Sequence, residues 1–186
     1  MTGSSTARAA RDHPGERLRA LGAEAFAHVN GTLDRHLHGT ERLLRRFGNR
    51  EAVCLAGLYH AVYGTAGIRG RLVDPRARTV IVEIIGADAE ALAYLYGACD
   101  RERFHPRIGT AAQRTFVDRF SGAQYSIVDS QLRGFCEITL ANEVELAQGN
   151  AAYRMRHAGE LMQLFARMRH HVSAAAYATA REVFQR

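Results

Sequence analysis

The sequence predicts a mainly α-helical domain with one small β-hairpin, and three observations support this prediction. Apolar residues recur at helical spacing over most of the chain, and helix start and stop signals bracket these stretches. Two short runs rich in β-branched and aromatic residues flank a turn at Ser121-Gly122. With 186 residues, of which 47% are hydrophobic, the chain can build one domain with a substantial core. We therefore expect a loose tail over residues 1–13 and a single domain over residues 14–186.

Three helices are expected in the first part of this domain. Pro14 marks the start of a helix that should run to about residue 30, because Asn30-Gly31 is a stop signal. Thr32 is a suitable cap for a second helix that ends near residue 47. A third helix should cover residues 50–63, before a Gly-rich loop.

The middle of the chain mixes helical and strand-like signals. Residues 79–85 are rich in β-branched side chains, but their surroundings favour a helix, and a further helix is expected over residues 87–100. Residues 101–110 contain Pro106 and Gly109 and are expected to form a loop.

The last third of the chain starts with the predicted hairpin, whose strands are residues 116–120 and 124–128. A helix capped by Asp129 or Ser130 should follow and reach about residue 148. Residues 152–184 have a helical apolar stripe and should form one long or two shorter helices, whose surplus of apolar residues suggests a possible homodimer.

The charge distribution argues against a nucleic-acid partner. All 25 basic residues are Arg, and the formal net charge is +6. These arginines are spread from Arg8 to Arg186 with acids between them, whereas a nucleic-acid-binding protein concentrates basic residues on one face. We therefore expect no nucleic acid as a partner.

Membrane insertion and export are also not expected. No apolar run approaches the roughly 20 residues that span a bilayer. The N-terminal stretch lacks the apolar centre of a secretion signal. Three cysteines, Cys54, Cys99 and Cys136, lie far apart among apolar neighbours, which is typical of buried thiols in a reducing compartment. The expected location is the cytoplasm.

Titratable residues on apolar helix faces are the candidates for a site, because their burial is costly unless something there requires them. His36 lies at the edge of an apolar helix face while His38 points outward, and His60 is the one readily ionisable group of an otherwise apolar helix. Glu143 falls within an apolar stripe, and Glu145 should face away from it.

A structural role is the alternative for each of these residues. His60 could be a core histidine hydrogen-bonded to a backbone carbonyl or to Tyr63, and His36 has the same kind of structural alternative. Glu143 could pair with an arginine, and Asp100 with Arg101 or Arg103.

Three sequence stretches resemble a known family. They are Asp-Arg-His-Leu-His-Gly-Thr at residues 34–40, Val-Cys-Leu-Ala-Gly-Leu-Tyr-His-Ala-Val-Tyr-Gly-Thr at residues 53–65 and Leu-Tyr-Gly-Ala-Cys-Asp-Arg at residues 95–101. Together they resemble an uncharacterised bacterial and fungal domain family related to the HD metal-dependent superfamily, over about residues 31–146.

The resemblance implies an HD-like helical fold in which His36, His60 and Asp100 bind a metal ion. An HD protein carries Asp directly after its second histidine, whereas this chain carries Ala61. A two-metal site is therefore not expected, and the remaining ligands suit one divalent Fe, Mn or Zn ion with open positions. The alternative is that the site has lost its metal. No nucleotide cofactor is indicated.

Such a site would favour hydrolysis of a small anionic molecule, most readily a phosphoester. A metal ion would activate a water molecule, with Glu143 or Tyr63 moving protons nearby. Thr65, Arg69 and Arg71 lie in the Gly-rich loop and would bind the anion. Two alternatives are a non-haem iron oxygenase and a metal-free small-molecule-binding or accessory protein with a degenerate HD site.

Overall fold

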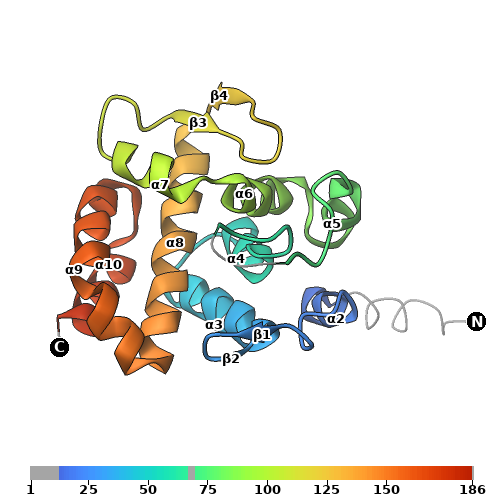
Figure 1. Ribbon diagram of the computed structural model, residues 1–186, viewed down its shortest axis with the longest axis horizontal. Coiled ribbons are helices and arrows are strands. Elements are labelled where there is room, and N and C mark those ends of the chain that lie inside the picture. The colour runs from blue at the N-terminus through green and yellow to red at the C-terminus, as the bar shows by residue number, and fades with distance from the viewer. Residues whose placement is uncertain (1–12, 67–69, 186) are drawn as a thin grey trace, which may run out of the picture.

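A central helix, α8 (Asp129–Gly149), organises the structure (Figure 1). The computed structural model describes residues 13–66 and 70–185. One group of helices packs against one side of α8: α3 (Leu33–Arg46), α4 (Glu51–Tyr59) and α6 (Ala87–Ala98). Helices α9 (Ala151–Met168) and α10 (Ala174–Phe184) pack against another side. The protein is thus mainly helical, as predicted.

The other described helices follow in chain order. They are α2 (Pro14–Ala20), α3 (Leu33–Arg46), α4 (Glu51–Tyr59), α5 (Arg78–Ile85), α6 (Ala87–Ala98), α7 (Arg101–Phe104), α9 (Ala151–Met168) and α10 (Ala174–Phe184). Two 3-10 turns, η1 (His105–Arg107) and η2 (Arg169–His171), follow α7 and α9. The helix expected over residues 79–85 is confirmed, and residues 152–184 form two helices.

Two antiparallel hairpins complete the described part of the chain. Strands β3 (Thr115–Val117) and β4 (Gln124–Ser126) form the hairpin predicted from the sequence. Strands β1 (Ala27–His28) and β2 (Gly31–Thr32) form a second one, which was not predicted.

Three sequence predictions are wrong in their extent. The third predicted helix, expected to reach residue 63, ends as α4 at Tyr59, and His60 is its C-cap residue. The first helix ends at Ala20 instead of near residue 30, because Gly22 adopts a positive φ of 96° and the chain then turns into β1. Residues 101–110 were expected to be a loop but begin with α7, which the side chain of Asp100 caps by accepting a hydrogen bond from the backbone of Arg103.

The core lies where α3, α4 and α6 meet α8. Its largest fully buried side chains include Tyr59, Tyr96 and Phe135, and the predicted buried cysteines are buried thiols. Gly57 lets α4 approach α3 closely, since a Cβ there would lie 2.1 Å from Leu44 Cδ1. This close packing fixes the helices that carry the candidate histidines.

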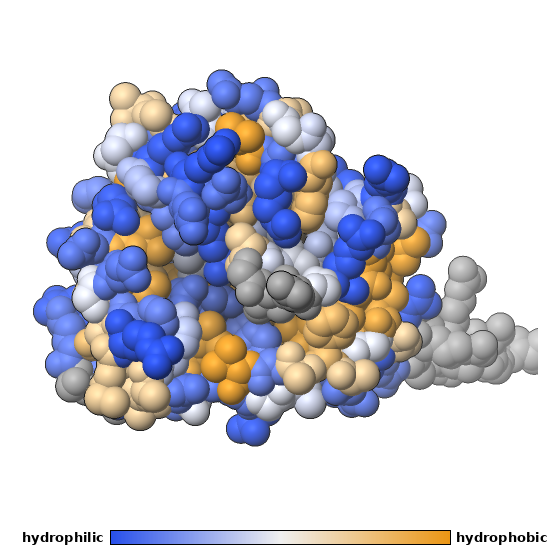
Figure 2. Space-filling view, in the orientation of Figure 1, coloured by the Kyte–Doolittle hydropathy of each residue, from blue (hydrophilic) through white to orange (hydrophobic). Residues whose placement is uncertain are grey.

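The surface is mixed in character. Hydrophilic side chains are spread over most of the face shown in Figure 2, with smaller hydrophobic areas between them. Among the described helices, none combines the length and the apolar character needed to cross a membrane. The predicted tail lies outside the described residues except for His13, whose ring nitrogen accepts a hydrogen bond from the backbone of Gly15 at the start of α2.

Candidate functional site

Helix α3 carries His36 into the core. Thr32 caps the helix by accepting a hydrogen bond from the backbone N–H of Arg35, as predicted. Leu33, Leu37 and Leu44 then form its buried face, and His36 lies among them with 2% exposure. The inward direction of His36 is confirmed.

Three imidazole rings meet at this place. The ring of His28, from β1, stacks on that of His36 with centroids 4.2 Å apart, and the ring of His60 meets His36 edge-on at 5.3 Å. The Nδ1 of His60 donates to the carbonyl of Gly57 at 2.7 Å. This is the backbone partner that the structural alternative for His60 anticipated.

Burial keeps two of these rings uncharged. It lowers the pKa of His60 well below 6.5, and the positive charge of His36 lowers it further. Burial also lowers the pKa of His28 to about 4, again with His36 as the next cause. The third ring, that of His36, has hydrogen-bond acceptors on α8 at both of its nitrogens.

Helix α8 supplies both of the hydrogen-bond partners of the His36 ring. His36 donates from Nδ1 to the carboxylate of Glu145, and from Nε2 to Oδ1 of Asn142 at 3.0 Å. A ring that donates from both nitrogens is an imidazolium. The charge of His36 is thus balanced by Glu145, inside the domain.

The hydrogen bonds continue beyond Asn142. Its side-chain N–H group donates to Glu143 at 3.1 Å, and the hydroxyl of Tyr153 donates to the other oxygen of Glu143. Glu145, His36, Asn142, Glu143 and Tyr153 therefore form one hydrogen-bonded series, which we call the polar row.

Glu143 is buried as predicted, but the prediction that Glu145 faces away is wrong. A glycine explains how Glu145 reaches His36. A Cβ at Gly39 would lie 2.7 Å from Cγ of Glu145, so the bare backbone of α3 leaves the space that this side chain occupies. The pattern of apolar residues in α8 could not predict this contact, because it depends on how α8 packs against α3.

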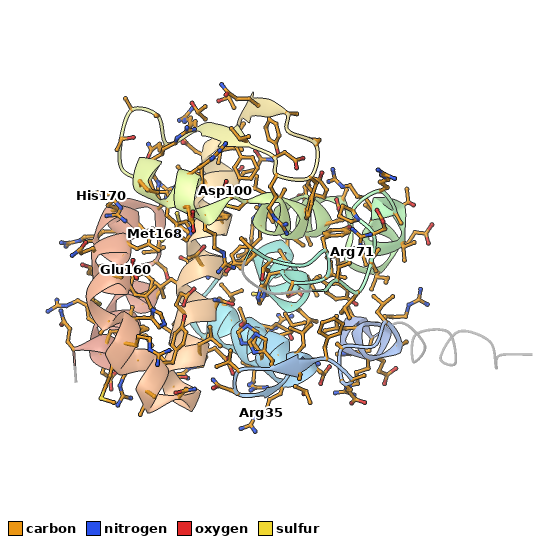
Figure 3. All side chains as sticks on the ribbon, viewed as in Figure 1. Arg35, Arg71, Asp100, Glu160, Met168 and His170 are labelled. Atoms are coloured by element: carbon orange, nitrogen blue, oxygen red, sulfur yellow. The ribbon has the colours of Figure 1, made fainter. Side chains whose placement is uncertain are left out.

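The far end of the polar row opens into a cleft of about 440 Å³ between α7, α8 and α9, which we call the α7/α9 cleft. Its lining residues come from both sides: Arg101, Glu102, His105, Pro106, Glu143, Tyr153, Glu160, Leu161, Leu164 and Arg167. The volume lies within the usual range for sites that bind small molecules. Glu160 projects from α9 on one side, and Asp100 marks the start of α7 on the other (Figure 3).

The cleft combines fixed charges with an uncharged histidine. Arg101 donates to the hydroxyl of Tyr96 at 3.1 Å; burial opposes its charge, but Tyr96 and Glu143 outweigh that effect and raise its pKa. Burial, followed by the charges of Arg101 and Arg167, lowers the pKa of His105 to about 4. The Nε2 atom of His105 is buried without a hydrogen-bond partner among the described residues. The neutral ring of this lining residue therefore keeps one nitrogen whose hydrogen-bonding capacity is unused among the described residues.

The predicted metal ligands do not form one group in this structure. Asp100 pairs with Arg103 at 3.3 Å and is 37% exposed, which matches the ion-pair alternative. Residues 13–66 and 70–185 contain no group of three or more His, Cys, Asp or Glu side chains placed to hold a metal ion. His36 and His60 alone are too few for the usual protein sites of Fe, Mn or Zn. The described residues therefore do not supply the ligand set of such a metal site.

The other predicted residues lie apart from the cleft. The hydroxyl of Tyr63 donates to the buried carboxylate of Glu90 at 2.7 Å, and burial, followed by Glu90, raises its pKa. Thr65 borders a cavity of about 10 Å³, room for roughly one water molecule. Arg71 also borders it and pairs with Asp74 at 2.8 Å, while Arg69 lies outside the described residues.

These features define a helical domain with a buried, charge-balanced histidine beside an open cleft. Residues 17–101 match the profile of a domain of unknown function (DUF6817). The match includes the three histidines and Arg101 but ends before α8. Searches of curated proteins and of solved structures gave no match.

Sequence reasoning missed three members of the site. His28 was placed inside a helix, although the positive φ of Gly31 forms a hairpin there instead. Asn142 lies next to Glu143 but was not a candidate, because the search of the sequence considered only titratable residues. Tyr153 was one aromatic residue among several, and only the packing of α9 on α8 brings it to Glu143.

Proposed function

We propose that this protein is a metal-free small-molecule-binding protein that takes a small anionic molecule with an apolar part into the α7/α9 cleft. A metal-free small-molecule-binding protein was one of the alternatives expected from the sequence. The expected ligand, a small anionic molecule, is the same, but we now propose that it binds in the cleft and not at the Gly-rich loop. The observation that carries the proposal is the polar row, because a series of buried polar side chains ends in this cleft.

The lining of the cleft supports both parts of such a ligand. Arg101 and Arg167 offer forked donors for a carboxylate or a phosphate. Leu161, Leu164 and Pro106 offer an apolar wall for the rest of the molecule. The buried Nε2 atom of His105 adds one neutral polar contact that can fix the orientation of the ligand.

Glu143 and Tyr153 add the capacity for proton transfer. The carboxylate of Glu143 accepts from Asn142 and Tyr153, so its oxygens are held in fixed directions at the wall of the cleft. A positioned carboxylate within reach of a ligand is a general base. An acid–base reaction on the bound molecule is therefore part of this proposal.

Calorimetric titration with benzoate and phenyl phosphate tests the binding site, since each carries an anionic group and an apolar ring. The Arg101→Met variant keeps most of the apolar stem and removes the charge. We expect it to weaken binding by about tenfold or more, the effect of one lost charge-assisted pair. Arg156→Met is the matched control, because Arg156 is exposed on α9 and does not line the cleft. Equal affinities of the two variants, or no binding of either probe, would refute the proposal.

The second candidate is an HD-type metal-dependent hydrolase or, with iron, an oxygenase. One observation favours it: the rings of His36 and His60 lie 5.3 Å apart, and the Gly57 carbonyl holds His60 in the way that backbone acceptors orient metal-binding histidines. Elemental analysis of protein purified without chelator or affinity tag tests it. One equivalent of Fe, Mn or Zn that His60→Ala removes and His38→Ala retains would favour this candidate over the metal-free protein.

A further inference from the structure

Three arginines share one face of α3. Arg35, Arg42 and Arg46 lie within an arc of roughly 40° at 100° per residue, and all three are exposed. Arg35 projects from the lower edge of the molecule (Figure 3). Arg42 and Arg46 are about 6 Å apart along the helix axis, so both guanidinium groups can reach one phosphate.

These arginines differ from their neighbour Arg45. The guanidinium group of Arg45 donates to the carboxylates of both Glu41 and Glu51. Arg35, Arg42 and Arg46 form no ion pair with any acid in residues 13–66 or 70–185. Their positive charge is therefore concentrated on one face and not balanced by nearby described carboxylates.

The same face borders a groove of about 380 Å³ between α3 and the end of α8, which we call the arginine groove. Its other wall is formed by Glu145, Gln148 and Gly149. The negative charge of Glu145 is balanced by His36, so it opposes an anion less than a free carboxylate would.

The two walls of the arginine groove suit different chemical groups of a ligand. The arginines attract an anion, whereas the last turn of α8 presents partial negative charge and the Gln148 amide, which suit hydroxyl groups. A bare anion satisfies only the first wall. A molecule with a phosphate at one end and hydroxyl groups at the other satisfies both.

We propose that the arginine groove is a second binding site, for a phosphorylated polyol such as a sugar phosphate. It is separate from the α7/α9 cleft, since the two are lined by different residues. The inference does not depend on the function proposed for the cleft.

Calorimetric titration of the full chain with glycerol 3-phosphate, inorganic phosphate and glycerol tests this site. We expect glycerol 3-phosphate to bind about tenfold or more tightly than inorganic phosphate, because only the former meets both walls. Arg42→Met should reduce its affinity by about tenfold, the effect of losing one forked pair. Arg45→Met should change it by less than about twofold, because Arg45 is occupied by two acids and does not line the groove.

Further variants separate the two walls. Gln148→Leu should reduce the preference for glycerol 3-phosphate over inorganic phosphate, with the affinity for phosphate unchanged. Circular dichroism of each variant confirms that the helices are intact. Equal binding of phosphate and glycerol 3-phosphate, or unchanged affinity in Arg42→Met, would overturn the proposal. Tighter binding of a short single-stranded oligonucleotide would also overturn it and identify a nucleic-acid backbone instead.

Discussion

Lowering the pH from 7 to 5 should destabilise this protein through histidines that are held uncharged, and His105 is the most direct example. Burial, then Arg101 and Arg167, lower its pKa from 6.5 to about 4. Between these two values the unfolded chain binds more protons than the folded one. The free energy of unfolding contributed by His105 is therefore fully present above pH 6.5 and is lost as the pH falls towards 4.

The expected size of this effect follows from the two pKa values. Between pH 7 and pH 5 the free energy of unfolding contributed by His105 would fall by about 1.8 kcal/mol without solvent screening, which is part of the effect of the full shift from 6.5 to about 4. His105 is only partly buried, so solvent screening reduces this to about 1 kcal/mol. Even this is a measurable part of a total stability of about 5–15 kcal/mol.

Urea denaturation at pH 7 and pH 5, followed by circular dichroism, measures the effect. Between pH 7 and pH 5, the free energy of unfolding of His105→Asn should fall by about 1 kcal/mol less than that of the wild type. His170→Asn is the control, because His170 is exposed, and it should follow the wild type. Identical pH dependence in His105→Asn and the wild type would show that the ring is not held uncharged.

Five further variants, two of them controls, test the helix packing, the buried carboxylate of Glu90 and the polar row by urea denaturation. Gly57→Ala should lower the free energy of unfolding by about 1–3 kcal/mol, because the new Cβ would clash with Leu44. Gly159→Ala, the control, should raise it by about 0.5–1 kcal/mol, because its Cβ meets no atom within 4 Å and alanine favours a helix. Equal effects of the two variants would contradict the close packing of α3 on α4. Glu90→Gln should lower the free energy of unfolding by about 2 kcal/mol or more, because Arg78 and Tyr63 both donate hydrogen bonds to that buried carboxylate. Glu83→Gln is the control; Glu83 is exposed, and its replacement should change the free energy of unfolding by less than about 0.5 kcal/mol. Asn142→Leu should cost about 1–3 kcal/mol by leaving Nε2 of His36 without its acceptor, and a neutral result would show that the row is not needed for folding.

Local sequence signals were sufficient where a helix is defined by its own residues. Residues 79–85 are rich in β-branched side chains, yet Ile81 and Ile85 are one helical turn apart and both are buried against the core. The surroundings thus outweighed the strand propensity, as expected. The first helix shows the opposite case, because Gly22 was overlooked as a stop signal in favour of Gly31.

Only part of the candidate site could be predicted from the sequence. The inward direction of His36 and Glu143 follows from helical periodicity, and that of His60 from a segment that is apolar all round. The structure confirms that all three side chains are buried. Their partners do not follow from it, since they depend on the register between α3 and α8. Glu145 illustrates this, because its contact with His36 requires the gap at Gly39, over one hundred residues away in the chain.

The polar row also bears on where this protein can be divided for expression. The profile of unknown function ends at residue 101, but the acceptors of the His36 charge come from α8, and the last member of the row comes from α9. A shortened chain ending at residue 101 would retain an interior cation without its counter-ion. The unit that must be produced intact therefore extends at least through Tyr153.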